Sequence, residues 1–201
     1  MIEASVKRKL GTFALSADIN DGGFICLAGR NGSGKTCFMK AICGQLPIDE
    51  GFVRLGGVDV TRLPVERKGI VMVTPGSSIP HLRVDPHLRW GAKLRGATLD
   101  EGRVSRVKEE LGIDFTGRVR TLSLGMRERV SLATALLTSP KVILVDEAFS
   151  NLHEREAFVS TYRRLASESG IDVVFSTQDE SEGRFADHLY VVAEGRTQKR
   201  A

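Results

Sequence analysis

Hydrophobic and polar residues alternate along the first part of the chain, and this alternation predicts β-strands. It extends over residues 2–9 and 12–19, on either side of Leu10-Gly11, which predicts two strands joined by a turn. A second turn signal, Asp21-Gly22-Gly23, leads into the continuous apolar run Phe24 to Ala28. That run predicts a buried strand.

A glycine-rich loop and a helix are predicted directly after this buried strand. The loop GRNGSGKT occupies residues 29–36, and CFMKAICGQL behind it carries apolar residues at helical spacing. Gly44 and Pro47 are stop signals for that helix. Phe52 to Leu55 and Ile70 to Val73 have the pattern of short strands.

The middle of the chain has helical spacing and the last part returns to β-type runs. From Leu82 to about Leu137 glycines interrupt a helical pattern, which predicts a helical lobe without strands. Strands are then predicted at residues 141–145, 172–175 and 189–192, with a helix near 154–167 between the first two. Strands that alternate with helices predict a largely parallel sheet with helices on its faces.

Composition indicates an ordinary globular protein. The 201 residues are 41% hydrophobic and 27% charged, which suits a single domain with a sizeable hydrophobic core. The net charge of +4 suits an anionic ligand or an anionic membrane face, although basic residues scattered in this way also fit a solvated surface. No DNA-binding signature accompanies them, so nucleic acid is not an expected partner.

Cysteine usage and hydropathy indicate a setting in the cytoplasm. Cys26, Cys37 and Cys43 are odd in number and lack CxxC spacing, which favours neither a disulfide framework nor a zinc site. No apolar segment approaches the ~20 residues that cross a bilayer, and residues 1–10 lack the apolar core of a signal peptide. A membrane process would therefore need a partner that supplies the membrane part.

The glycine-rich loop matches the phosphate-binding pattern G-x-x-x-x-G-K-[ST]. Its glycines let backbone N–H groups turn toward an anion, and the next helix directs its N-terminus at the same phosphates. Such a pattern can arise by chance in a surface loop, but the preceding strand and following helix favour nucleotide binding. Lys35 is expected to reach the β- and γ-phosphates and Thr36 to bind Mg²⁺. The expected nucleotide-binding residues here are Gly29, Arg30, Asn31, Gly32, Ser33, Gly34, Lys35, Thr36 and Cys37.

Two adjacent carboxylates, Asp146 and Glu147, end the apolar run Val142 to Val145. In a nucleotide-binding sheet, a strand that ends in Asp brings a carboxylate to the edge where phosphates and Mg²⁺ bind. Asp146 is therefore a predicted Mg²⁺ ligand, and Glu147 is predicted to orient or deprotonate the attacking water. Without a phosphate loop, such a pair would more often mark the entrance to a loop.

A third motif, TLSLGMRERVSLATALL at residues 121–137, lies between the first two. In this order the three motifs resemble those of ABC-type ATPases, the nucleotide-binding subunits of ABC transporters. Leu122, Ser123 and Gly125 match the LSGGQ signature, and the residues after it match the helix that follows in the family. The resemblance covers nearly the whole chain. SSIPHLRV and RLPVERKGI are most similar to importer ATPases for molybdate, tungstate and related oxyanions.

The resemblance implies an α/β P-loop NTPase fold of ABC-ATPase type. Its core would be a mixed, largely parallel sheet with an N-terminal antiparallel β subdomain and an inserted helical subdomain. Residues 1–201 would form a single domain, with 1–75 and 138–201 as the nucleotide-binding core and 76–137 as the helical signature subdomain.

The resemblance also implies cofactors and partners. Two ATP molecules with Mg²⁺ would be held in a head-to-tail dimer, identical or not, between the phosphate loop of one subunit and Ser123 and Gly125 of the other. Hydrolysis would release the dimer and drive a transmembrane permease, with a solute-binding protein as a further partner. The protein is expected in the cytoplasm, peripheral on the inner face of the cell membrane.

Several positions depart from the family pattern. Thr74 replaces the Gln that contacts Mg²⁺ or the water, and Gln178 replaces the switch His while keeping one hydrogen-bond donor for the γ-phosphate. His153 replaces the Asp after SNL, and Leu124 and Met126 replace Gly and Gln of the signature. Leu10 occupies the usual place of the aromatic residue that stacks on adenine, so Phe13 is the predicted substitute, with a core position as the alternative.

These departures leave more than one hypothesis for function. The first is an ATP-hydrolysing subunit that powers an ABC transporter, with Glu147, Lys35 and Gln178 as its catalytic residues. The second is a regulatory subunit that binds ATP, hydrolyses it slowly or not at all, and pairs with a more complete ATPase. A soluble ABC-type ATPase of repair or translation is disfavoured, because the chain has one ATPase unit and no long coiled coil. The retained Glu147 favours the first hypothesis.

Overall fold

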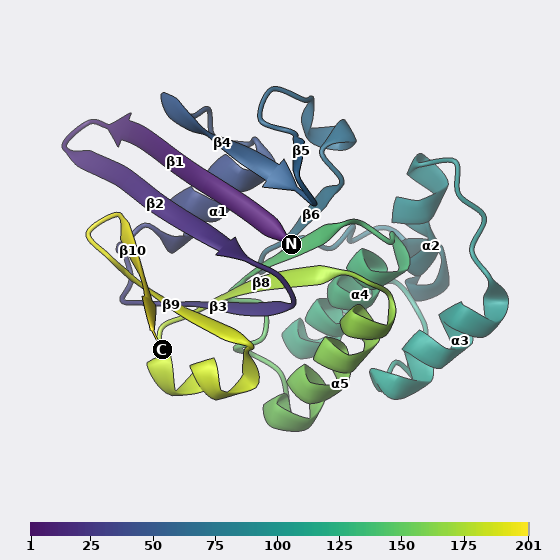
Figure 1. Ribbon diagram of the computed structural model, residues 1–201. Coiled ribbons are helices and arrows are strands. Elements are labelled where there is room, and N and C mark those ends of the chain that lie inside the picture. Colours follow the sequence, from purple (N-terminus) through teal and green to yellow (C-terminus); the bar gives the residue numbers. More distant parts are fainter. Residues whose placement is uncertain (201) are drawn as a thin grey trace. The chain divides into compact units, whose positions relative to one another are not determined.

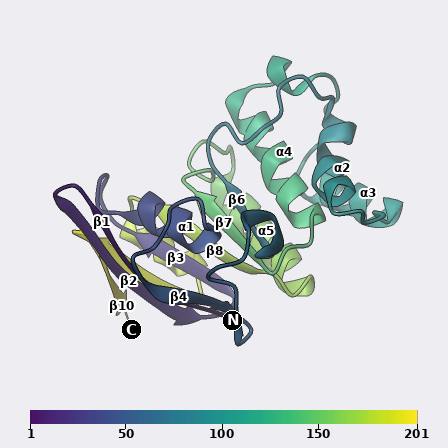
Figure 2. The same cartoon turned by 90° about the horizontal axis from the view of Figure 1, so that it is seen from above.

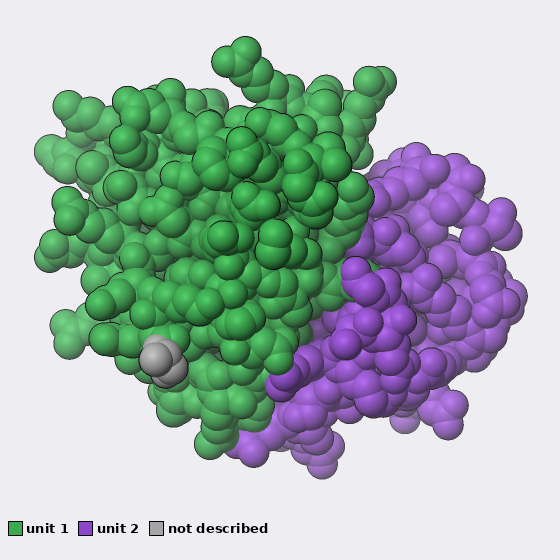
Figure 3. All heavy atoms as spheres, in the orientation of Figure 1, with its two compact units in different colours: residues 1–72, 141–146, 171–201 green, residues 73–140, 147–170 purple. Residues whose placement is uncertain are grey.

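The computed structural model describes residues 1–200, and the chain forms two compact units (Figure 3). Unit 1 comprises residues 1–72, 141–146 and the segment from 171 onward, and unit 2 comprises residues 73–140 and 147–170. The chain thus changes unit at the peptide bond between Asp146 and Glu147. The division into a nucleotide-binding core and a helical subdomain at the boundaries given above stays a prediction.

One mixed sheet of ten strands has the order β5-β4-β1-β2-β10-β9-β3-β8-β7-β6. Strand β3 pairs in parallel with β8 and β9, and β7 pairs in parallel with β8, whereas β1 is antiparallel to β2 and β4. The predicted mixed sheet with an antiparallel N-terminal part is confirmed. The strands are β1 Ile2–Leu10, β2 Phe13–Asp21, β3 Phe24–Ala28, β4 Glu50–Leu55, β5 Val58–Asp59, β6 Ile70–Val73, β7 Val142–Asp146, β8 Asp172–Thr177, β9 His188–Ala193 and β10 Arg196–Arg200.

Helix α1, Lys35–Cys43, packs against β1, β2 and β7 of unit 1 (Figures 1 and 2). Its apolar face, with Phe38, Met39 and Ile42, is fully buried in the core that these strands form. The helix ends at Gly44, whose φ of 86° is the left-handed conformation that glycine adopts at little cost. Two 3₁₀ turns, η1 Val65–Arg67 and η3 Glu180–Phe185, also belong to unit 1.

Unit 2 is helical, as the spacing predicts. It contains α2 Val84–Leu94, α3 Glu101–Glu110, the 3₁₀ turn η2 Val119–Thr121, α4 Leu124–Leu137 and α5 Arg155–Glu168 (Figure 1). Helices α2 and α3 both pack on α4. Tyr162 of α5 donates a hydrogen bond to the Leu132 carbonyl of α4 at 3.2 Å, and its ring packs with Phe149 and Phe158. Among the helices described within residues 1–200, none has both the length and the apolar character needed to span a membrane.

Candidate functional site

The glycine-rich loop connects β3 to α1 and is held by backbone hydrogen bonds. The Gly29 N–H donates to the Thr177 carbonyl at 3.0 Å, and the Gly195 N–H donates to the Ser33 carbonyl at 2.8 Å. A Cβ on Gly29 would lie 2.3 Å from the Val192 carbonyl oxygen, so only glycine fits this approach of two backbones. Gly34, with φ 110°, begins the turn into α1.

Lys35 is the first residue of α1 and is buried. Its ammonium donates to the Gly29 carbonyl at 2.6 Å and to the Arg30 carbonyl at 3.1 Å. The side chain therefore folds back along the loop to which it belongs. A buried ammonium beside a helix N-terminus makes this loop attractive to an anion.

Asp146 and Thr36 are brought together at the end of β7. The Thr36 hydroxyl donates to Asp146 Oδ2 at 2.7 Å, and the Ser176 hydroxyl donates to Asp146 Oδ1 at 2.7 Å. Asp146 pairs with Ser176 in the parallel register of β7 and β8, which places the serine beside the carboxylate. Ser176 was not predicted, because only this register makes it a neighbour of Asp146.

The hydroxyl and carboxylate oxygens of Thr36 and Asp146 suit Mg²⁺. This ion prefers oxygen ligands and is usually bound through one or two carboxylates together with waters and substrate phosphates. Within residues 1–200 no group of three or more His, Cys, Asp or Glu side chains could hold a metal on its own. The donor set therefore fits a Mg²⁺ that binds together with a nucleotide.

Ser33 carries a polar atom in the loop that lacks a partner. Its hydroxyl oxygen is buried and makes no hydrogen bond to any other residue between 1 and 200. A buried hydroxyl without a partner costs free energy, and such groups are rare in folded proteins. A phosphate oxygen at the loop would supply the missing acceptor.

Phe13 packs on the same loop. A Cβ on Gly34 would lie 2.9 Å from Phe13 Cζ, and one on Gly195 would lie 3.0 Å from it. The half-buried ring also packs against the hydrophobic core of unit 1. Both the adenine-stacking and the core interpretation are compatible with this position.

The remaining predicted residues of unit 1 lie along the loop and strand ends. Arg30, Asn31 and Gly32 are exposed at the tip of the loop, and Cys37 is half-buried in α1. Gln178 is exposed and directly follows β8.

Glu147 and Thr74 belong to unit 2. Glu147 is half-buried and has φ 56°, an unusual conformation for a residue with a side chain. The Thr74 N–H donates to the Ser77 hydroxyl at 2.8 Å, and the two hydroxyls are 2.9 Å apart. Thr74 is thus part of a local turn.

The signature segment begins α4. Ser123 is the N-cap residue, and its hydroxyl accepts a hydrogen bond from the Met126 N–H at 3.3 Å. A Cβ on Gly125 would lie 3.0 Å from the Asn151 carbonyl oxygen, so the segment SNLH, residues 150–153, approaches α4 closely at this glycine. Leu124 is 43% exposed.

Two further residues of α4 attach the SNLH segment to the helix. The Asn151 amide donates to Glu128 Oε1 at 2.9 Å, and the Arg129 guanidinium donates to the His153 carbonyl at 3.0 Å and the Leu111 carbonyl at 2.9 Å. Burial raises the pKa of Glu128, and its Oε2 has no hydrogen-bond partner among the described residues. Glu128 was not predicted as a buried residue, since a charged residue in a helix ordinarily faces solvent.

A phosphate loop between a strand and a helix, with a buried aspartate at the end of another parallel strand, defines a P-loop NTPase. The family model for ABC transporters matches residues 13–150. The chain therefore belongs to the ABC transporter family, and it is an ATP-binding ATPase subunit of that family.

Relatives and solved structures agree with this family. The chain is 33% identical over 202 residues to the molybdate/tungstate import ATP-binding protein WtpC of Archaeoglobus fulgidus, covering 97% of the chain and 84% of the relative. It is 32% identical over 191 residues to the Fe(3+) ions import ATP-binding protein FbpC of Streptomyces avermitilis, covering 91% of the chain but only 55% of that relative.

The fold itself is shared with the ATP-binding subunit of an ABC transporter. That solved structure has a TM-score of 0.83 at 20% identity and covers 100% of the chain and 90% of its own length. A bacterial Atm1-family ABC exporter with ATP bound has a TM-score of 0.81 at 20% identity, with 98% of this chain and 38% of the exporter covered. The predicted fold class is confirmed.

Proposed function

We propose that the chain hydrolyses ATP with Mg²⁺ and thereby powers uptake of an oxyanion through a membrane permease. ATP binding and hydrolysis follow from the family, and the similarity to the molybdate/tungstate import protein supports an oxyanion as the substrate. The substrate assignment also rests on the segments SSIPHLRV and RLPVERKGI.

The contact of Thr36 with Asp146 carries this proposal. At 2.7 Å the hydroxyl and the carboxylate are close enough to serve one small cation, and Ser176 fixes the second carboxylate oxygen. When bound, Mg²⁺ would neutralise charge on the phosphates. The chain itself supplies the loop N–H groups that bind the phosphates, and Lys35 and Ser33 that orient them.

Glu147 is the proposed base for the attacking water. A carboxylate within hydrogen-bond reach of a water molecule can hold it in line and accept its proton. Gln178 would donate a hydrogen bond to the γ-phosphate, and Thr74 would act near the water or the cation. Phe13 would stack on adenine.

A second ATPase subunit, identical or different, would complete the site. Its Ser123 and Gly125, at the N-terminus of α4, would meet the γ-phosphate bound by the first subunit. The permease, and a solute-binding protein with it, would hold the dimer at the inner face of the cell membrane. No helix of residues 1–200 could make that attachment by spanning the bilayer.

Phosphate release by the chain together with its permease tests the proposal. We expect hydrolysis that requires Mg²⁺ and that Glu147→Gln lowers by about 10²- to 10⁴-fold, while binding of a fluorescent ATP analogue persists. Glu66→Gln, which changes an exposed carboxylate of η1, should leave the rate unchanged. An ATP hydrolysis rate that is unchanged by EDTA or by Glu147→Gln would disprove the proposed function.

A further inference from the structure

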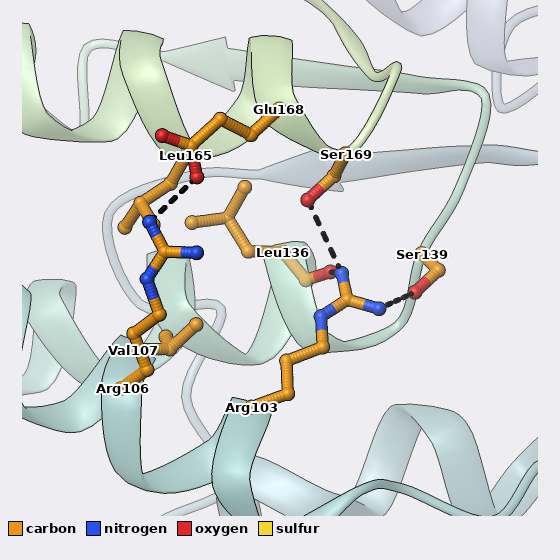
Figure 4. A pocket seen from close by; sticks show the side chains of 8 residues that line it. All are labelled: Arg103, Arg106, Val107, Leu136, Ser139, Leu165, Glu168 and Ser169. Carbon is orange, nitrogen blue, oxygen red and sulfur yellow. Dashed lines mark hydrogen bonds and ion pairs between the residues drawn. The ribbon is translucent and has the colours of Figure 1, made fainter.

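A cavity of about 370 Å³ opens in unit 2 among α3, the last turn of α4 and the last turn of α5 (Figure 4). Its size is within the range of pockets that bind small molecules. It contains none of the residues predicted to bind nucleotide. Its polar wall carries Arg103 and Arg106 from α3, and Ser139 and Ser169 from the segments after α4 and α5.

Arg103 is bound only by neutral oxygens. Its Nη1 donates to Ser139 Oγ at 2.8 Å, and its Nη2 donates to the Leu136 carbonyl at 3.1 Å and to Ser169 Oγ at 3.5 Å (Figure 4). Between residues 1 and 200 no carboxylate forms an ion pair with this guanidinium. Because a guanidinium has five N–H donors, the Nε group and one Nη1 hydrogen are left for a ligand.

The other arginines around the cavity are already neutralised. Arg106 donates to Glu110 at 2.8 Å and Glu168 at 2.6 Å, and Arg164 forms ion pairs with the same two carboxylates. Hydrogen bonds from Arg106 and Arg164 lower the pKa of both glutamates, so these carboxylates stay charged and remain with those arginines. The unbalanced positive charge therefore belongs to Arg103.

Ser139 has a backbone conformation that is unfavourable for a residue with a side chain, and its hydroxyl belongs to the polar wall of the cavity. It is the residue after the C-cap of α4 and has φ 50°, a conformation for which glycine is strongly preferred at this position. Unfavourable backbone conformations of this kind concentrate at functional sites. A glycine at this position would relieve the unfavourable conformation but would lack the hydroxyl that lies 2.8 Å from Arg103 Nη1.

The rest of the lining selects the kind of anion. Val107, Leu136 and Leu165 supply an apolar floor, and Glu168 lines the same cavity. A dianion would be repelled by Glu168, whereas a single carboxylate matches the net charge of one. Its oxygens can accept hydrogen bonds from a remaining N–H of Arg103 and from the serine hydroxyls. An apolar body attached to that carboxylate would cover the floor.

We propose that this pocket binds a small organic carboxylate, with its carboxylate group on Arg103 and the hydroxyls of Ser139 and Ser169, and its apolar body on Val107, Leu136 and Leu165. Bound there, the ligand joins α3, α4 and α5. It therefore stabilises the packed form of unit 2.

Calorimetric titration of the full chain with sodium hexanoate tests the pocket, with thermal unfolding as a second measurement. We expect binding in the millimolar range or tighter and a rise in Tm. Arg103→Leu should abolish binding. Arg103→Lys keeps the charge but has too few N–H donors to bind Ser139, Leu136 and a ligand together, and should weaken binding at least about tenfold. Arg95→Leu, which removes an exposed arginine after α2, is the matched control.

Ser139→Gly separates binding from stability. The substitution relieves the left-handed conformation and should raise Tm without ligand, yet it removes a hydroxyl and should weaken hexanoate binding. Failure of the wild type to bind hexanoate, or equal binding by Arg103→Lys and the wild type, would overturn the proposal. Tighter binding of hexylphosphonate or of hexylamine than of hexanoate would overturn the assignment to a carboxylate.

Discussion

Asp146 has each of its carboxylate oxygens engaged by a hydroxyl group, one from Thr36 and one from Ser176. The two hydroxyls have different roles in the proposed site. Thr36 follows the loop lysine and would itself bind the cation. Ser176 would instead orient the Asp146 carboxylate through a hydrogen bond to Oδ1, without contacting the cation. A residue that orients a metal ligand tunes its affinity without touching the metal.

Ser176→Ala should therefore raise the Mg²⁺ concentration that gives half-maximal ATP hydrolysis by about 10- to 100-fold. The rate at saturating Mg²⁺ should change much less, because no group that contacts the phosphates is removed. The measurement is hydrolysis against Mg²⁺ concentration, with Ser160→Ala, an exposed serine of α5, as the control. An unchanged Mg²⁺ requirement would refute the orienting role.

Glu128 gives a pH-dependent contribution to stability. Burial raises its pKa above the value it has in the unfolded chain, so the contribution is complete below the unfolded pKa and is lost as pH rises through the folded pKa. Glu128→Gln keeps the shape of the side chain, and its amide oxygen can still accept the hydrogen bond from the Asn151 amide. We expect it to raise Tm relative to wild type at about pH 8, with a smaller difference at about pH 4, in thermal melts. A Tm difference between Glu128→Gln and wild type that is larger at about pH 4 than at about pH 8 would contradict a raised pKa for Glu128.

The sequence reveals some of these residues and conceals others. Lys35, Thr36 and Asp146 follow from motifs, because the chemistry of phosphate and Mg²⁺ binding restricts residue type and local spacing together. Ser176 and Glu128 do not, because their partners are 30 and 23 residues away in the chain. Only strand register and helix packing determine such neighbours.

Helix α4 is attached to the SNLH segment by Arg129. Its guanidinium bonds the Leu111 and His153 carbonyls at 2.9 and 3.0 Å and lies 5.0 Å from the centre of the Phe158 ring. One side chain thus connects three segments of unit 2, and the segment that carries the unusual His153 is held through its backbone. The identity of residue 153 therefore leaves this attachment intact.

Arg129→Ala should lower the free energy of unfolding by about 2 kcal/mol, because two carbonyls lose a charged donor. Urea unfolding followed by Trp90, the single tryptophan and a residue of unit 2, measures the change. Arg129→Lys should recover part of the loss, and Arg127→Ala on the same helix is the control. Equal stability of the two alanine variants would argue against the attachment.

The elements show where hydrophobic patterning succeeds and where it fails. Residues 24–28 and 70–73 were predicted as strands with the bounds the structure has, because both are continuous apolar runs between turn signals. Strand β10, RTQKR, was not predicted, since it has no apolar residue. The signal that could have found it is the two-residue link Glu194-Gly195, whose φ values of 48° and 75° suit a tight hairpin after β9.

For the whole molecule, the proposed catalytic groups are distributed over both units. Asp146 belongs to unit 1, whereas the next residue, Glu147, belongs to unit 2. Ser123 and Gly125 also belong to unit 2. A cycle of ATP binding and hydrolysis would therefore involve both units of one chain and, in the proposed dimer, those of a second.

Glu147→Gln should form a dimer with Mg²⁺ and ATP that the wild type forms only transiently, because trapped ATP bridges the two subunits. Size-exclusion chromatography with light scattering gives the mass directly. ADP in place of ATP should leave the variant monomeric, and Ser123→Ala added to it should reduce the dimer fraction. A monomer under all of these conditions would exclude a homodimer driven by ATP.

The two ends of the ten-stranded sheet also affect how the chain behaves at high concentration. The sheet ends at β5, which has two residues, and at β6, which has four. An edge strand with unpaired N–H and C=O groups is a template on which another chain can add a strand. Edges as short as these offer few such groups, so we expect contacts between chains to involve side-chain surfaces rather than sheet extension, and concentrated samples to resist fibre formation.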